Sequence, residues 1–224
     1  MAPHSPQLMN KAEIIARIQE PGIVAIIRAD SSEQLLEASK ALLEGGVTTM
    51  EITMTTPNAL QVIYEVTQAL GDKILMGVGT VLEPHTAEEA VNAGAQFVVT
   101  PAFRPAVIEF CHRNEIPIAS GAMTPTEALF THEAGADFVK LFPADNLGPG
   151  FIRNLLAPLP MLKIIPTGGV TPANAAEFLA AGSVALGAGS SLVSKEILKN
   201  ADWQKLTAHA AEFVAAVNKA RNLS

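Results

Sequence analysis

Eight short apolar runs, separated by segments of helical periodicity, constrain the fold of this chain more than any other feature. In the segment 58–70, for example, apolar side chains recur at Leu60, Ile63 and Val66, which is the spacing of one helix face. Strands that alternate with helices indicate βαβ units and a parallel sheet. The apolar runs cover residues 23–28, 49–54, 74–81, 97–101, 116–121, 138–143, 163–168 and 184–188.

Eight such units in 224 residues fit a small (β/α)8 barrel, the TIM-barrel fold, with a doubly wound open sheet as the alternative. We predict a single domain over residues 1–224, in which 22–224 form the barrel and 1–21 carry an extra N-terminal helix at 10–19. A last helix is predicted at 202–221. Hydrophobic residues make up 49% of the chain and charged residues only 17%, as expected for a sheet buried on both faces.

Composition also excludes several classes of function. The formal net charge of -7 argues against a broad nucleic-acid surface, although backbone N–H groups can still hold one phosphate. The single cysteine, Cys111, forms neither an internal disulfide nor a cysteine metal site, and no two histidines have metal-ligand spacing. Residues 1–19 lack a signal-peptide pattern, and no apolar run is long enough to span a membrane. We therefore predict a cytoplasmic protein that binds neither nucleic acid nor membranes.

A weak internal repeat supports a closed barrel. Gly46, Gly94, Gly135 and Gly182 each end a helical segment and lead into an apolar run, with separations of 48, 41 and 47 residues. Helix ends often need a residue in the left-handed conformation, which glycine adopts easily. Each interval holds two βα units, so the glycines precede strands two, four, six and eight.

The position five residues after each glycine defines a candidate layer inside the barrel. These positions are Glu51, Val99, Lys140 and Gly187. Alternate strands of a (β/α)8 barrel supply one interior layer of four side chains. This register predicts that Glu51 and Lys140 lie at the same height on opposite strands.

Lys140 stands in an otherwise apolar run. Burying a lysine there costs free energy unless its amine reaches water along the apolar stem or pairs with a carboxylate. Alternatively it has a chemical role, because burial favours the neutral amine that attacks carbonyl carbons. Glu51 shares a strand face with Thr49 and Thr53, so it is either a structural carboxylate or one that moves protons. The two residues together favour imine chemistry.

Two glycine loops follow the seventh and eighth apolar runs. Gly168-Gly169 is followed by Thr171-Pro172, which we predict to be the N-cap and first turn of a helix. The second loop is the stretch 187–191. Paired loops after strands seven and eight are the usual phosphate site of these barrels, and two ordinary tight turns are the alternative.

Two other strand ends carry polar residues. Gly77-Val78-Gly79-Thr80 resembles the start of a dinucleotide fingerprint, but Leu82 stands where the third glycine belongs, so NAD binding is excluded. Thr80 either offers its hydroxyl to a ligand or simply ends a strand. Arg28 closes the first run, where it either clamps a carboxylate or phosphate or pairs with Asp30.

Taken together, these residues resemble the 2-keto-3-deoxy-6-phosphogluconate (KDPG) aldolase family, which also cleaves 4-hydroxy-2-oxoglutarate. The stretches that carry the resemblance are spread over residues 22–195. They are Met50-Glu51-Ile52-Thr53, Gly77-Val78-Gly79-Thr80-Val81, Ala93-Gly94-Ala95-Gln96-Phe97, Thr100-Pro101, Phe138-Val139-Lys140-Leu141-Phe142-Pro143-Ala144, Pro166-Thr167-Gly168-Gly169-Val170 and Gly189-Ser190.

The resemblance implies a class I aldolase that needs neither a metal nor a cofactor, assembles as a homotrimer, and takes a phosphorylated 2-keto acid and pyruvate. It implies Lys140 as the Schiff-base lysine and Glu51 as the proton-transferring base. The implied substrate contacts are Thr80 and Pro101 at the pyruvate end, Phe142 beside the imine, Thr167 at a substrate hydroxyl, and Gly168, Gly169, Gly189 and Ser190 at the phosphate.

The chain departs from the family pattern at Thr55, where some members carry a carboxylate-binding arginine. Arg28 resembles an arginine that other members place on strand one, and it is the candidate for this role. Thr167 favours KDPG over its galactonate epimer, because relatives that act on the epimer tend to have an apolar residue there. Outside this family, the alternatives are a metal-free sugar-phosphate isomerase or epimerase and a non-catalytic phosphate-binding barrel.

Overall fold

The computed structural model describes residues 9–30 and 33–222. Within them parallel strands alternate with helices along the chain. The strands are β1 (Ile23–Ile27), β2 (Thr49–Thr53), β3 (Leu75–Gly79), β4 (Phe97–Val99), β5 (Ile118–Ala122), β6 (Phe138–Leu141), β7 (Ile164–Pro166) and β8 (Leu186–Ala188). The helices are α1 (Lys11–Gln19), α2 (Leu35–Glu44), α3 (Ala59–Leu70), the short 3-10 helix η1 (Gly71–Lys73), α4 (Pro84–Asn92), α5 (Pro105–Arg113), α6 (Pro125–Glu133), α7 (Gly148–Leu156), α8 (Ala175–Ala180), α9 (Lys195–Asn200) and α10 (Trp203–Arg221).

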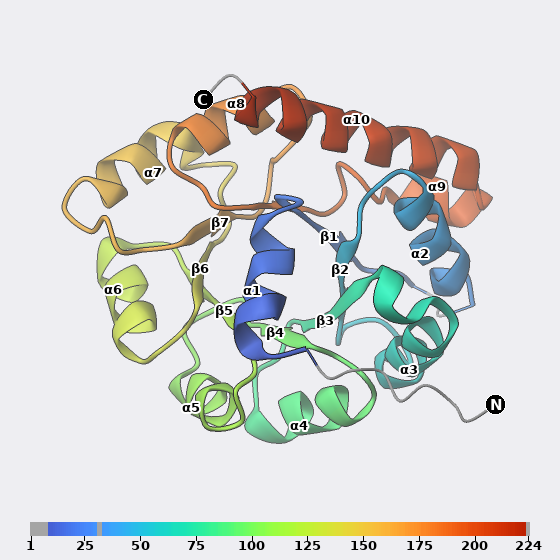
Figure 1. Cartoon of the computed structure of the whole chain (residues 1–224), viewed down its shortest axis with the longest axis horizontal. Helices are drawn as coiled ribbons and strands as arrows, with labels where there is room; N and C mark the ends of the chain where they lie inside the picture. Colours follow the sequence, from blue (N-terminus) through green and yellow to red (C-terminus); the bar gives the residue numbers. More distant parts are fainter. Residues whose placement is uncertain (1–8, 31–32, 223–224) are drawn as a thin grey trace.

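The strands form one barrel. Their order is β7-β6-β5-β4-β3-β2-β1-β8, and a parallel bridge between Thr167 and Gly187 joins the β7 end to β8. The helices α2 to α10 surround the strands, as Figure 1 shows. The prediction of a (β/α)8 barrel is therefore confirmed, and the doubly wound alternative is wrong.

Apolar residues pack in two separate clusters. The larger one lies between the strands and the outer helices and contains the outward-facing side chains Met50, Ile52 and Val139. The smaller one fills the barrel interior, with Phe97 and Phe138 among its members. Alternation along each strand sends successive side chains to these two clusters.

The N-terminal helix α1 closes one end of the barrel. Its buried Ile14 and Ile18 belong to the interior cluster, and the helix lies across the strands in Figure 1. Asn10 and Glu13 form a capping box that fixes where the helix begins. The predicted extra helix at 10–19 is thus confirmed.

Polar contacts fix α1 to the barrel. Lys11 Nζ lies 3.0 Å from the Asp137 carboxylate, and the Thr49 hydroxyl donates to the Arg17 carbonyl at 3.0 Å. At the other end of the chain, Arg221 donates to the carbonyl of Gln19 at 2.6 Å. The first and last described helices are therefore held against each other.

The four glycines of the internal repeat adopt the backbone expected of them. Gly46, Gly94, Gly135 and Gly182 have φ angles of 90°, 114°, 93° and 106°, in the region that favours glycine. They lead into β2, β4, β6 and β8, as predicted.

Some predicted boundaries were wrong. The helix expected to start at Thr171-Pro172 begins at Ala175, because the Asn174 side chain accepts from the Thr171 N–H and donates to the Gly169 carbonyl. Most strands are shorter than their apolar runs; β3, for instance, ends before Thr80, whose φ is 60°. The helices η1 and α9 were not predicted.

Residues 1–8, 31–32 and 223–224 of the predicted domain lie outside the described residues. The assignment of 1–224 to a single domain stays a prediction.

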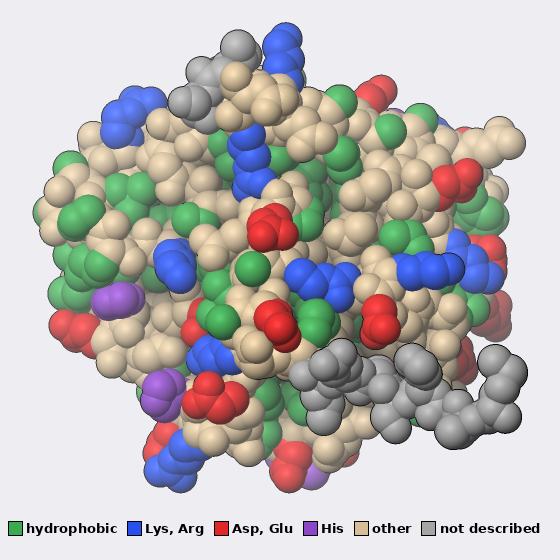
Figure 2. Space-filling view, viewed as in Figure 1, with side chains coloured by type: hydrophobic (Ala, Val, Ile, Leu, Met, Phe, Trp, Pro, Cys, Tyr) green, Lys and Arg blue, Asp and Glu red, His purple; other side chains and the backbone are tan. Residues whose placement is uncertain are grey.

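Charges of both signs are mixed over the surface around α1. Figure 2 shows Lys and Arg side chains interspersed with Asp and Glu on this face. Among the described helices, none is long and apolar enough to cross a membrane.

The single cysteine provides a test of the packing under α5. Cys111 is fully buried, and burial raises the pKa of its thiol to about 12. We expect no reaction with a disulfide reagent at pH 8 while the protein is folded, and complete reaction in guanidinium. Absorbance of the released thiolate measures both. Rapid modification of the native protein would contradict this packing.

Candidate active site

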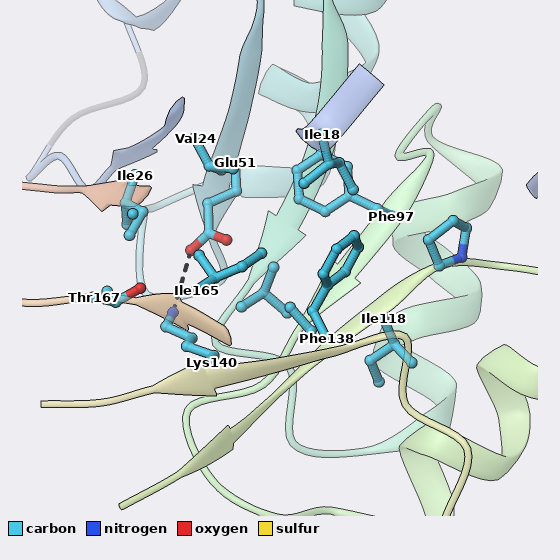
Figure 3. Close-up of a pocket in the computed structure, with 14 residues that line it drawn as sticks. Ile18, Val24, Ile26, Glu51, Phe97, Ile118, Phe138, Lys140, Ile165 and Thr167 are labelled. Carbon is cyan, nitrogen blue, oxygen red and sulfur yellow. Dashed lines mark ion pairs between the residues drawn. The ribbon is translucent and has the colours of Figure 1, made fainter. Parts of the chain in front are cut away.

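A lysine and a glutamate meet at the centre of the barrel. Lys140 Nζ, from β6, lies 3.6 Å from Glu51 Oε1, from β2, and the two side chains are only 9% and 2% exposed. Figure 3 shows the carboxylate and the amine pointing toward each other across the interior. The glycine register predicted this juxtaposition.

The alternation of β2 and β6 explains how these polar side chains come to face inward. Met50 and Ile52 flank Glu51 and pack outward, as Val139 and Leu141 do beside Lys140. A one-residue shift in the register of either strand would turn its two apolar side chains toward the barrel interior. It would also bury the charged side chain in the outer apolar core.

Burial dominates the electrostatics of Glu51. Loss of contact with water raises the pKa of its carboxyl, and the positive charges of Lys140 and, less strongly, Arg28 oppose the rise. Among the described residues, Oε1 has no hydrogen-bond partner, because the lysine stands slightly too far away. The carboxyl is therefore poised to gain or lose a proton.

The pair lines a largely apolar pocket. Val99 and Gly187, the other two members of the predicted layer, line the same pocket together with Thr167. Ile18 of α1 and Phe97 lie on the side away from the lysine, as Figure 3 shows. The interior therefore excludes bulk water on one side of the pair.

Two glycines make room for the polar groups. A Cβ at Gly79 would lie 2.4 Å from Glu51 Oε1, and one at Gly187 would lie 2.3 Å from Thr167 Oγ1. Both separations are far below van der Waals contact. Larger residues at these positions would displace the carboxylate or the hydroxyl.

Phe142 follows β6 at the mouth of the site. Lys140 Nζ lies 5.6 Å from the centre of its ring, within the range of a cation–π contact. The ring is about one-third exposed, at 37%. The ring therefore lies beside the amine, and its role beside an imine stays a prediction.

The two glycine loops lie side by side. Gly168 and Gly169 have φ angles of 98° and 70°, and the Ser191 hydroxyl donates to the Val170 carbonyl at 2.6 Å. This bond joins the loop after β7 to the loop that contains Gly189 and Ser190. The structure thus brings the four predicted phosphate-binding residues to one end of adjacent strands.

Thr80 and Pro101 occupy neighbouring strand ends. Thr80, half-buried, follows β3 with its strained φ of 60°, which is unusual for a β-branched residue. Pro101 follows β4 and packs so tightly on Gly121 that a Cβ there would come within 2.2 Å of its carbonyl carbon.

Arg28 and Thr55 lie at the rim, and both are exposed. Arg28 forms no ion pair with Asp30, whose carboxylate instead lies 3.6 Å from Lys195 Nζ. The guanidinium of Arg28 is close enough to act on Glu51 electrostatically. Thr55 shares a hydrogen bond of 2.9 Å with Thr53.

Sequence reasoning did not single out three residues that shape the site. Ile18 lines the pocket from α1, Ser191 joins the two glycine loops, and Asp145 packs its Cβ against Gly169. Only Ser191 had a signal, since it belongs to the 187–191 loop. The other two depend on tertiary packing.

The structure is a (β/α)8 barrel with a buried lysine–carboxylate pair at its centre and two glycine loops joined by a hydrogen bond. These features place it among the barrels that carry an amine at the centre of the site. Within this group, the family model for KDPG and KHG aldolase matches residues 14–209. The chain belongs to this family.

Curated relatives cover nearly the whole chain. A 2-dehydro-3-deoxy-phosphogluconate aldolase of Treponema pallidum (strain Nichols) is 34% identical over 196 residues, which are 87% of this chain and 93% of the relative. A 2-dehydro-3-deoxy-6-phosphogalactonate aldolase of Escherichia coli (strain K12) is 34% identical over 199 residues, 88% and 95% of the two chains.

Solved structures share the fold at high similarity. One is the KDPG aldolase of Legionella pneumophila with pyruvate captured as a covalent carbinolamine intermediate, with a TM-score of 0.82, 27% identity and coverage of 91% of this chain and 97% of that one. Another is a cube-shaped protein cage designed by fusing symmetric oligomeric domains, with a TM-score of 0.84, 33% identity and coverage of 90% and 74%.

The electrostatics of the pair can be measured directly. In protein labelled with 13C-glutamate, the pKa of Glu51 should be above the usual glutamate range, and Lys140→Met should raise it further by removing the nearest positive charge. Glu127 is the internal control, because the Met123 N–H donates to its carboxylate and lowers its pKa. A fall in the Glu51 pKa on loss of the lysine would contradict this account.

Proposed function

We propose that this protein is a class I aldolase that cleaves KDPG to pyruvate and glyceraldehyde 3-phosphate through a Schiff base on Lys140. The observation that carries the proposal is the buried pair of Lys140 and Glu51, 3.6 Å apart inside the barrel. Family membership and the aldolase activity named for the curated relatives support it. The carbinolamine seen in the Legionella pneumophila enzyme supports covalent chemistry with pyruvate.

In this mechanism, the neutral amine of Lys140 attacks the C2 ketone and water leaves, which forms an iminium ion. Glu51, directly or through a water, takes the proton of the C4 hydroxyl. The C3–C4 bond then breaks, its electron pair moves into the iminium, and glyceraldehyde 3-phosphate departs. Glu51 returns the proton to C3 of the enamine, and hydrolysis of the new iminium releases pyruvate and Lys140.

The surroundings of the pair suit these steps. A carboxyl whose pKa is raised by burial accepts and returns a proton more readily near neutral pH than an exposed one. The apolar wall around Phe97 and Phe138 keeps bulk water from one side of the amine. Phe142 packs beside the amine, where it can face the iminium.

We assign the remaining contacts along the substrate. Arg28 holds the carboxylate in place of the arginine that is absent at Thr55, and Thr80 and Pro101 hold the pyruvate end. Thr167 meets a substrate hydroxyl. The phosphate is held by Gly168, Gly169, Gly189 and Ser190, whose loops the Ser191–Val170 hydrogen bond keeps together.

We also propose that the chain assembles as a homotrimer and acts in the cytoplasm. The designed cage supports self-association, because its matching chain is 33% identical to this one and the cage was designed by fusing symmetric oligomeric domains. Trimerisation and location both stay predictions.

The Schiff base can be trapped chemically. Incubation with pyruvate and borohydride should place a reduced adduct on Lys140, detected by peptide mass spectrometry. Lys163→Met is the matched control. Lys163 directly precedes β7, and its Nζ lies over the Phe138 ring, 6.0 Å from the ring centre. Lys140→Met should abolish the adduct, and Lys163→Met should retain it. An adduct that persists without Lys140 would contradict the mechanism.

Thr167 tests the choice of substrate. Thr167→Val removes the hydroxyl but keeps the shape, so kcat/KM for KDPG should fall roughly tenfold, as expected when one hydrogen bond is lost. The galactonate epimer and 4-hydroxy-2-oxoglutarate, assayed by coupled pyruvate release, should be less affected. An equal loss on all three substrates would show that Thr167 does not read the C4 configuration.

A further inference from the structure

Two buried hydroxyl groups lie on the outer side of the neighbouring strands β4 and β5. Val98 and Ile118 pair in register and belong to the cluster between the strands and the helices. Thr100 and Ser120 come two residues later, and the Thr100 N–H continues the ladder by donating to the Ala119 carbonyl at 3.0 Å. Alternation therefore turns both hydroxyls toward the outer core, where both residues are fully buried. A hydroxyl in an apolar core costs free energy unless it is hydrogen-bonded.

The Thr100 hydroxyl is the centre of a small hydrogen-bond network. It donates to the Ala102 carbonyl at 2.7 Å, and it lies 3.1 Å from the Ser120 hydroxyl. It also accepts from the Gly121 N–H at 3.3 Å. A hydroxyl offers one donor and two acceptor sites, so these three contacts are as many as it can make. The network ties the turn that carries Pro101 to the neighbouring strand.

The same turn packs over Gly121 on the interior side of β5. Ala119 belongs to the interior cluster, so a side chain two residues later, at Gly121, would also point into the barrel. A Cβ there would lie 2.2 Å from the Pro101 carbonyl carbon and 2.4 Å from the Ala102 nitrogen. The peptide between these two residues therefore occupies that space. Gly121 pairs with Lys140 in the sheet, so the peptide lies over the strand position next to the catalytic lysine.

We propose that Thr100 and Ser120 are positioning residues that hold the Pro101–Ala102 peptide at the pyruvate end of the site. The inference rests on the proposed aldolase function and on the contact assigned there to Pro101. Because both hydroxyls face the outer core, they act through the turn and do not touch the substrate. The peptide is thus fixed from two sides. The gap at Gly121 admits it on the interior side, and the hydroxyl network fastens it on the outer side.

Loss of the Thr100 hydroxyl should loosen the turn and leave the barrel folded. The Ala102 carbonyl and the Gly121 N–H would each lose a hydrogen bond, and the peptide would move away from its place beside Lys140. The turn holds the pyruvate end alike in the bound substrate and in the transition state, so its loss raises KM with little change in kcat. We expect Thr100→Val to raise the KM for KDPG roughly tenfold, the effect of one lost hydrogen bond. Thr100→Ser keeps the hydroxyl and should restore the original KM.

The experiment measures steady-state kinetics with KDPG and the pyruvate concentration that gives half-maximal borohydride trapping on Lys140. It compares the full chain with Thr100→Val, Ser120→Ala and the variant that carries both changes. The double variant should raise KM no further than Thr100→Val alone, because the two hydroxyls act through one network. Thr131→Val is the matched control. Thr131 is also fully buried, but its hydroxyl has no hydrogen-bond partner among the described residues, so KM should stay unchanged.

The outcomes separate this role from the aldolase proposal. An unchanged KM in Thr100→Val and Ser120→Ala, with a normal adduct on Lys140, would overturn the positioning role and leave the aldolase standing. The same conclusion follows if Thr131→Val raises KM equally, because the effect would then belong to any buried hydroxyl. If Thr100→Val does not fold, the milder Ser120→Ala decides by the same measurements. An original chain that neither cleaves KDPG nor forms the adduct would overturn both proposals.

Discussion

The ion pair between Lys140 and Glu51 is the constraint on which the rest of the site depends. Removing two charges from water costs several kcal/mol per ion, and their mutual attraction repays this only when the geometry is good. Here the partners stand 3.6 Å apart and one carboxylate oxygen has no hydrogen bond within the described residues. The pair therefore contributes little to stability, which is the pattern expected where polar groups are retained for chemistry.

The barrel makes this arrangement possible by controlling what surrounds the pair. Gly79 and Gly187 leave the space that the carboxylate and the Thr167 hydroxyl occupy. Ile18 of α1 lines the interior on one side, and the glycine loops lie at the ends of β7 and β8. The apolar packing thus sets both the desolvation of Glu51 and the direction from which a ligand can enter.

Much of the barrel and of the Lys140–Glu51 pair could be predicted from the sequence, because strand alternation has a fixed period and the repeat glycines mark strand starts. A strand alternates its side chains with a period of two, and the four repeat glycines fix where each even-numbered strand begins, which placed Glu51 opposite Lys140. What could not be predicted depends on contacts between distant segments. The Asn174 side chain delays α8 to Ala175, and the packing of Asp145 on Gly169 has no local signal.

The backbone at Thr80 is strained next to the site. A β-branched residue at φ 60° costs about 1–3 kcal/mol and persists only where its neighbours hold it. Within one subunit the visible restraint is the hydrogen bond from the Val81 N–H to the Val99 carbonyl, at 3.2 Å. Leu82 comes next in the chain and is 46% exposed, so the solvent-facing side of this segment adds little packing, and the contact with β4 is what holds the strained backbone.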